Sequence, residues 1–206
     1  MNHVKEVCVE SFDEAFKAAA AGASRIELCE NLAVGGTTPS LGTIKRCLER
    51  LPIPVMVMIR PRGGNFTYSS DEFEIMKEDI HQCKIQNVRG VVFGLLGEDG
   101  EIDKLRTAQL VQLSRPMEVT FHKAIDLTPD LMESLSFLKE IGVERILTSG
   151  GKDTALEGAA ILNQMVQFAT PALTIVVAGK VTAANFAEIS QIIPSQEYHG
   201  RKLVVF

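Results

Sequence analysis

The chain has 206 residues, of which 46% are hydrophobic, 23% charged and 6% aromatic, and this composition excludes a disordered or fibrous protein. Its net charge of −5, from 21 basic and 26 acidic residues, disfavours a nucleic-acid-binding protein. No run approaches the ~18 apolar residues of a membrane span. The N-terminal segment also lacks the apolar core of a secretory signal. We therefore expect a cytoplasmic protein with reduced thiols and no membrane partner.

Apolar, β-branched runs alternate with segments of helical periodicity along the whole chain. The runs predict strands at 4–9, 25–29, 55–60, 90–95, 118–123, 145–149, 174–178 and 197–199. The segments between them predict helices at 12–22, 41–50, 71–86, 103–114, 129–140, 154–169 and 183–193. No linker or low-complexity stretch interrupts this order, so we expect a single domain over residues 1–206.

Local signals mark several helix ends. Ser11 with Glu14 has the spacing of a capping box. Thr128 followed by Pro129 predicts a cap with proline at the first helical position. Gly22 and Gly142 each follow a helical segment and indicate its end.

Strict alternation of strands and helices predicts a parallel sheet covered by helices. Eight strands favour a closed (β/α)8 barrel of the TIM type, with an open doubly wound sheet as the second choice. No Gly-x-Gly-x-x-Gly follows the first strand, which removes the main reason for a dinucleotide-binding fold. Only seven helices are predicted, so we expect a barrel without its last helix. Its uncovered flank would expose apolar surface and favour a homo-oligomer of two or more chains.

In such a barrel, the ends of the strands and the loops after them form the mouth where ligands bind. Arg60 and Arg62 flank a proline there, and two guanidinium groups on a stiff turn suit a carboxylate or phosphate. The alternative interpretation is a structural ion pair between Arg60 and Glu27. His122 is a candidate general base or metal ligand beside Glu27 and Asp126, or else a hydrogen-bonded structural residue.

Two glycine-bearing turns follow later strands and contain Ser149 with Gly150, and Lys180. Their backbone amides could hold an anion, as the late loops of barrels often do. The alternative is a tight turn that needs positive φ. We therefore count Arg60, Arg62, Ser149, Gly150 and Lys180 as candidate anion-binding residues.

Cys8 and Cys29 lie in sequential strands, which are neighbours in a barrel. Two nearby thiolates form a soft site suited to Cu(I). Alternatively, both are small apolar core residues, because no Cys-x-x-Cys spacing supports a metal site. We assign the other candidate sulfur residues to packing: Cys47, Cys83, Met56 and Met58.

Several motifs together resemble the CutC family, in order from about residue 4 to residue 200. They are Glu-Val-Cys-Val-Glu-Ser at 6–11, Arg-Ile-Glu-Leu-Cys at 25–29, Gly-Gly-Thr-Thr-Pro-Ser at 35–40, Met-Ile-Arg-Pro-Arg-Gly-Gly-Asn-Phe at 58–66, Val-Thr-Phe-His-Lys-Ala-Ile-Asp at 119–126 and Arg-Ile-Leu-Thr-Ser-Gly at 145–150. The resemblance implies a TIM-type barrel, a role in cytoplasmic copper homeostasis, Cu(I) binding and self-association.

The family's proposed copper ligands match Cys8 and Cys29. Two features depart from the family pattern. The glycine-rich turn after the seventh strand is reduced to Ala-Gly-Lys-Val at 178–181, and the chain stops at Phe206, where longer members continue into a final helix.

Two functions remain open at this point, beside a non-catalytic scaffold. The first is a copper homeostasis protein that binds Cu(I) through Cys8 and Cys29. The alternative is a barrel enzyme of unassigned reaction that acts on a small phosphorylated or carboxylated metabolite. In that enzyme Arg60 would hold the anion, and His122 with Glu27 would supply acid–base chemistry.

Overall fold

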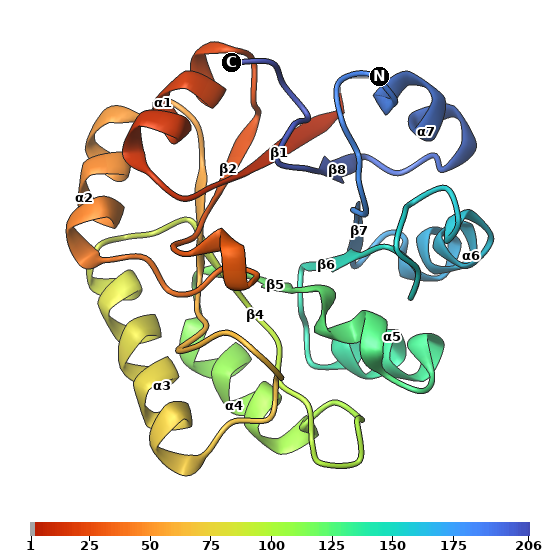
Figure 1. The fold of residues 1–206 in the computed structure, drawn as a ribbon. Helices are drawn as coiled ribbons and strands as arrows, with labels where there is room; N and C mark the ends of the chain where they lie inside the picture. The colour runs from red at the N-terminus through yellow and green to blue at the C-terminus, as the bar shows by residue number, and fades with distance from the viewer. Residues whose placement is uncertain (1–2) are drawn as a thin grey trace.

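The structure, a computed structural model, describes residues 3–206. Eight parallel strands follow one another around a closed barrel, and β8 pairs with β1 to complete it (Figure 1). This ring confirms the closed barrel and excludes the open sheet. The strands are β1 (Val4–Val9), β2 (Arg25–Leu28), β3 (Val55–Met58), β4 (Gly90–Phe93), β5 (Glu118–Phe121), β6 (Arg145–Thr148), β7 (Thr174–Val177) and β8 (Glu197–His199).

Seven α-helices surround the barrel, and none follows β8 within residues 3–206. They are α1 (Phe12–Ala20), α2 (Leu41–Arg50), α3 (Ser70–Ile85), α4 (Lys104–Ser114), α5 (Leu131–Glu140), α6 (Ala159–Ala169) and α7 (Phe186–Ile192). Short 3₁₀ helices, η1 (Leu32–Val34) and η2 (Lys123–Leu127), follow β2 and β5. In Figure 1, the C-terminal segment, and no helix, runs between α7 and α1.

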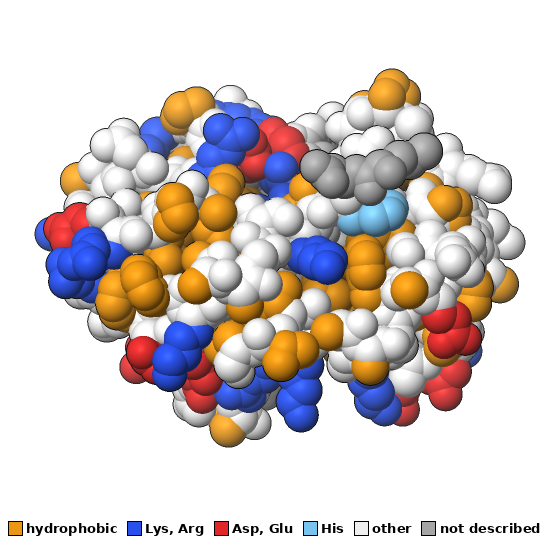
Figure 2. Space-filling model, turned by 90° about the horizontal axis from the view of Figure 1, so that it is seen from above, with side chains coloured by type: hydrophobic (Ala, Val, Ile, Leu, Met, Phe, Trp, Pro, Cys, Tyr) orange, Lys and Arg blue, Asp and Glu red, His pale blue; other side chains and the backbone are white. Residues whose placement is uncertain are grey.

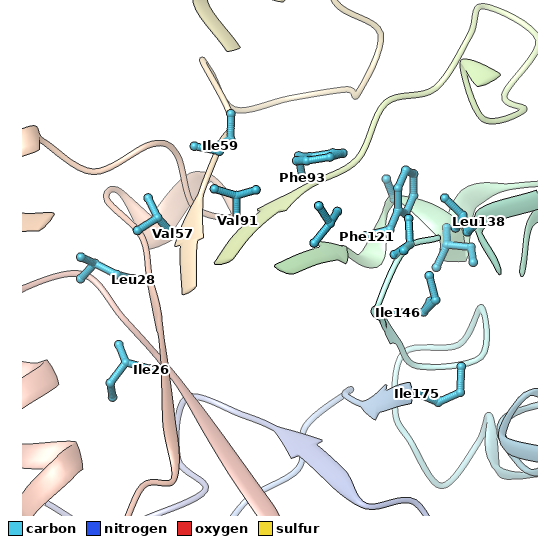
Figure 3. Packing of buried hydrophobic residues seen from close by; sticks show 14 of the residues in the cluster. Ile26, Leu28, Val57, Ile59, Val91, Phe93, Phe121, Leu138, Ile146 and Ile175 are labelled. Atoms are coloured by element: carbon cyan, nitrogen blue, oxygen red, sulfur yellow. The ribbon is translucent and has the colours of Figure 1, made fainter. Parts of the chain in front are cut away.

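The main hydrophobic core lies between the barrel and its helices. Successive side chains of a strand point to opposite faces, so every second residue faces the helices. Figure 3 shows this outer layer, in which Phe93 and Phe121 are fully buried and the helix residue Leu138 packs against the strands. The remaining labelled side chains are Ile26, Leu28, Val57, Ile59, Val91, Ile146 and Ile175.

The helix ends agree only in part with the sequence signals. The Ser11 side chain accepts a hydrogen bond from the N–H of Glu14, as predicted, but the Glu14 carboxylate accepts from the N–H of Glu10. Helix α5 starts later than predicted, because Asp130 caps it by accepting from two N–H groups of the first turn. Thr128 instead donates its hydroxyl to a carbonyl of η2.

Charged side chains occupy the inside of the barrel at the starting ends of β1, β2, β5, β6 and β8. Arg25 bridges the carboxylates of Glu6 and Glu197. Arg145 lies 3.1 Å from Glu197 and also contacts Glu118. These five side chains are at most 20% exposed, so each charge is compensated inside the barrel rather than by water.

The outer core predicts an asymmetry between two chemically identical substitutions. Leu138→Ala removes a fully buried side chain of α5, so we expect the free energy of unfolding to fall by about 2–5 kcal/mol. Leu105→Ala removes a side chain of α4 that is 72% exposed, and should change it by less than about 0.5 kcal/mol. Urea denaturation measures both values. Equal losses would contradict this placement of the core.

Candidate metal centre

Strand alternation brings five polar side chains together inside the barrel near β1, β2 and β8. Because Ile26 and Leu28 face the helices, the alternate residues Glu27 and Cys29 face the interior. From β1, the same alternation directs Glu6 and Cys8 inward, and β8 adds His199.

Short contacts connect this cluster. The Sγ atoms of Cys8 and Cys29 are 3.8 Å apart, and Cys29 Sγ lies 3.7 Å from Glu27 Oε2. His199 contacts two carboxylates, with Nδ1 2.9 Å from Glu6 Oε1 and Nε2 3.7 Å from Glu27 Oε2. All five residues are buried except His199, whose side chain is 13% exposed. The group is therefore buried, and solvent reaches it at His199.

Ligand atoms of Cys8, Glu27 and His199 all lie within 4.8 Å of one another, which is close enough for one metal ion to contact all three. Met56 and Met58 pack in the same cluster as the two cysteines. Thiol, thioether and imidazole donors are the set that Cu(I) prefers, whereas a carboxylate is a hard ligand that suits other ions. The donors therefore fit a soft cation.

Both thiols hold their protons strongly. The hydrogen bond to Cys29, burial and the negative charge of Glu27 raise the pKa of Cys8 well above its ordinary value. For Cys29, the hydrogen bond from Cys8 lowers the pKa, but burial and Glu27 outweigh it and raise the pKa overall. A bound cation must therefore displace these protons to obtain thiolate ligands.

The carboxylates and His199 form a coupled group of charges. Burial opposes ionisation of Glu6, but Arg25 and His199 lower its pKa to about 2. Burial raises the pKa of Glu27 despite the charge of His199, because no arginine pairs with this carboxylate within residues 3–206. Burial likewise disfavours a charge on His199, yet Glu27 and Glu6 raise its pKa well above its ordinary value. His199 is therefore a cation held between two carboxyl groups.

A pocket of about 350 Å³ reaches this group at Cys8. It lies beside α1, on the flank where no helix follows β8 within the described chain. Cys8 forms part of its wall, and the other lining residues are Glu14, Arg201, Lys202, Val204, Val205 and Phe206. Cys8 is thus the cysteine nearest to a solvent route.

The structure places His122 on the inner face beyond the end of β5, outside the metal-ligand group. Its Nδ1 accepts the N–H of Ala124 at 3.2 Å, and its ring centre lies 4.8 Å from that of Phe66. Nε2 is buried and has no hydrogen-bond partner within residues 3–206. Burial, together with the charge of Arg60, lowers the pKa of His122 to about 3. The imidazole is therefore neutral at physiological pH.

Arg60 is held by backbone carbonyl groups. Its guanidinium donates to the carbonyls of Val34, Gly36 and Gly64, at 2.7–3.0 Å, and lies over the ring of Phe66. No carboxylate pairs with it in the described chain, so the alternative interpretation of an Arg60–Glu27 ion pair is wrong.

Arg62 has separate partners. It pairs with Glu72 at 2.6 Å and donates to loop carbonyls. The two arginines thus stabilise the loop after β3 through separate hydrogen-bond sets rather than facing one anion together.

The turn after β6, which contains Ser149 and Gly150, is occupied by the protein's own carboxylate. Asp126 accepts the N–H groups of Ser149 and Gly151 at 2.9–3.2 Å, and Gly150 donates to a threonine hydroxyl. Burial opposes the charge of Asp126, but Lys123 and these hydrogen bonds lower its pKa. The candidate residue Lys180 is not part of this turn; it lies after β7 and lines a pocket there.

One member of the metal-ligand group, His199, was not predicted from the sequence. Met56 and Met58 lie in a buried apolar cluster, as predicted. The usable signal in the sequence was strand alternation, which places every second residue of a strand on the same face. Both methionines occupy every second position of β3, and the partner of His199, Glu6, lies on the neighbouring strand although 193 residues separate them.

Comparisons with known proteins agree on one family. The sequence model of the CutC family matches residues 3–204. A mouse (Mus musculus) protein named copper homeostasis protein cutC homolog is 45% identical over 194 residues, covering 94% of this chain and 71% of its own. A human (Homo sapiens) protein of the same name is 44% identical, with the same coverage.

Solved structures support the fold. A crystal structure described as CutC from Streptococcus agalactiae has a TM-score of 0.93 and 36% identity, covering 98% of this chain and 100% of that one. A deoxyribose phosphate aldolase from Aeropyrum pernix has a TM-score of 0.68 at 11% identity, covering 97% and 86%, which shows a shared barrel and nothing more. Within residues 3–206, no helix has the length and apolar character needed to cross a bilayer.

The lowered pKa of His122 predicts a pH dependence of stability. Below pH 6.5 the unfolded chain takes up a proton on this histidine, while the folded chain resists it down to about pH 3. Protonation therefore favours unfolding, and this histidine reduces stability as the pH falls through that window. His122→Asn removes this contribution. We expect the stability difference, wild type minus variant, to shrink or reverse from pH 6.5 to 3.5, measured by urea denaturation. A constant difference would contradict the neutral, buried state.

Proposed function

The chain belongs to the CutC family, and on that premise we propose that it is a cytoplasmic copper homeostasis protein that binds Cu(I) at Cys8 and Cys29. The observation that carries the proposal is the pair of buried thiols, 3.8 Å apart on neighbouring strands. A small shift of either side chain would allow both sulfurs to contact one ion. Cu(I) prefers such soft donors and low coordination numbers.

The surroundings of the thiols support a role for each neighbour. His199 lies within reach of an ion bound at Cys8 and becomes a third donor once it loses a proton, and its contact with Glu6 fixes the orientation of the ring. Glu27 accepts from Cys29 Sγ and has a raised pKa, so it can take up the proton that the metal displaces. Copper enters here as cargo, exchanged for thiol protons.

The alternative, an enzyme in which Arg60 holds an anion and His122 with Glu27 performs acid–base catalysis, has less support. The guanidinium of Arg60 is engaged by three carbonyl groups. With a pKa of about 3, His122 is a weak base near neutral pH. We therefore place copper binding first.

A competition titration against a chromogenic Cu(I) chelator, under anaerobic reducing conditions, tests the copper proposal. We expect the wild type to withdraw Cu(I) from the chelator, and Cys8→Ala/Cys29→Ala to lose at least about 100-fold in affinity, since loss of a supporting partner alone costs 10–100-fold. The affinity of the wild type should increase with pH, because binding releases the thiol protons.

The matched control is Cys47→Ala/Cys83→Ala, which removes two buried thiols from α2 and α3. Its affinity should equal that of the wild type. If both double variants bind Cu(I) as the wild type does, the site does not lie at Cys8 and Cys29.

We also propose that the chain self-associates through the flank between α1 and α7. The C-terminal residues Val205 and Phe206 are 83% and 49% exposed there. Figure 2 looks onto this side and shows hydrophobic side chains spread among basic ones. Exposed apolar side chains with polar residues around them are typical of an association surface.

Light scattering coupled to size-exclusion chromatography tests the association. We expect Phe206→Asp to shift the wild-type oligomer toward the monomer, because a carboxylate in an apolar contact remains unpaired. Leu105→Asp introduces the same change at an exposed leucine of α4 and should leave the mass unchanged. A monomeric wild type would contradict the proposal.

A further inference from the structure

A second pocket, of about 450 Å³, opens beside the ends of β7 and β8. Four of its lining residues are basic: Lys123, Lys180, Arg201 and Lys202. Asp153 is the one acidic residue among those that line it. A pocket of this volume can hold a small organic ligand. The balance of charge around it favours an anion.

Two of the four cations have no carboxylate partner. Lys123 pairs with Asp126 at 2.6 Å, and Arg201 lies 3.5 Å from Glu10 and 3.8 Å from Glu14. Within residues 3–206, neither Lys180 nor Lys202 forms an ion pair. The pocket thus retains two uncompensated ammonium groups against a single carboxylate, Asp153.

Backbone donors line the same pocket. The turn after β7 places Gly179 and Lys180 in the left-handed region, at φ values of 99° and 56°. A Cβ at position 179 would lie 2.7 Å from Cβ of Ser149, so only glycine allows the turn to approach so closely. The N–H groups of Gly179, Lys180 and Val181 donate to no acceptor in the described part of the chain.

The turn after β6 provides an internal comparison. There, the N–H groups of Ser149 and Gly151 are used by the Asp126 carboxylate, which acts as an internal anion. The turn after β7 has amides and two ammonium groups but no internal carboxylate bonded to them. In many TIM-type barrels, the loops after the seventh and eighth strands form the binding site for a phosphoryl group.

We propose that this pocket is a binding site for a small organic phosphate monoester. The phosphoryl oxygens accept from the turn at 179–181 and from the ammonium groups of Lys180 and Lys202. The remaining volume accommodates the organic part against Ala178 and Val181. His199 lines the pocket and also belongs to the metal-ligand group, so the two sites are neighbours, but the phosphate site does not depend on the proposed copper binding.

Isothermal titration calorimetry with the full chain tests the site, using glycerol 3-phosphate, inorganic phosphate and glycerol as probes. We expect glycerol 3-phosphate to bind, inorganic phosphate to bind more weakly, and glycerol not to bind. Lys180→Asn/Lys202→Gln should weaken glycerol 3-phosphate binding by about 100-fold, roughly tenfold per charge-assisted hydrogen bond. Asparagine is chosen at position 180 because it tolerates positive φ.

Two control variants separate this site from other effects. Lys45→Gln removes an exposed charge from α2 and should leave the affinity unchanged, as should Cys8→Ala/Cys29→Ala, whose effect is confined to copper. If the chain does not bind copper, the test of phosphate binding therefore remains valid. Absence of saturable glycerol 3-phosphate binding, or equal affinity in Lys180→Asn/Lys202→Gln and the wild type, would overturn the proposal. If inorganic phosphate bound as tightly as glycerol 3-phosphate, the proposal that the pocket also binds the organic part of the ligand would be wrong.

Discussion

The bridge that Arg25 forms between Glu6 and Glu197 is the interaction on which the rest of the barrel interior depends. It joins β2 to β1 and β8, the strands at which the barrel closes. Each of these charges is buried, so removing one would leave an uncompensated charge, at a cost of about 3–5 kcal/mol. Glu6 also contacts His199, which contacts Glu27 in turn. The candidate metal-ligand group of Cys8, Glu27 and His199 is therefore connected to a structural ion pair.

Most of the fold follows from patterns that are local in the sequence. The strand starts at Val4, Arg25 and Val55 agree with the prediction, because apolar, β-branched runs begin there. The ends of β1 and β8 also agree, whereas those of β2 to β7 were placed one or two residues too far, since polar residues at the mouth continue the alternation after pairing has stopped. The start of α5 was wrong for a related reason. Several residues could cap this helix, and only the path of the preceding 3₁₀ helix selects Asp130.

The site was less accessible from sequence, because its contacts join distant segments. Neighbouring strands suggested that Cys8 and Cys29 lie close together, and they do. Nothing local indicated that Glu6 would fix His199, or that Asp126 would fill the glycine turn after β6. Arg60 shows the same limit. An isolated arginine at the mouth suggests a ligand, whereas in the structure three loop carbonyls accept hydrogen bonds from its guanidinium.

Two different parts of the chain form the candidate metal-ligand group and the pocket at Cys8. The donors stand on strands of a closed barrel, where a change in geometry disturbs many ladder hydrogen bonds. The wall of the pocket is instead formed largely by residues 201–206, which contain no helix and no named strand. For the proposed copper site, the strands thus determine the arrangement of the donors, while this segment forms the route to solvent.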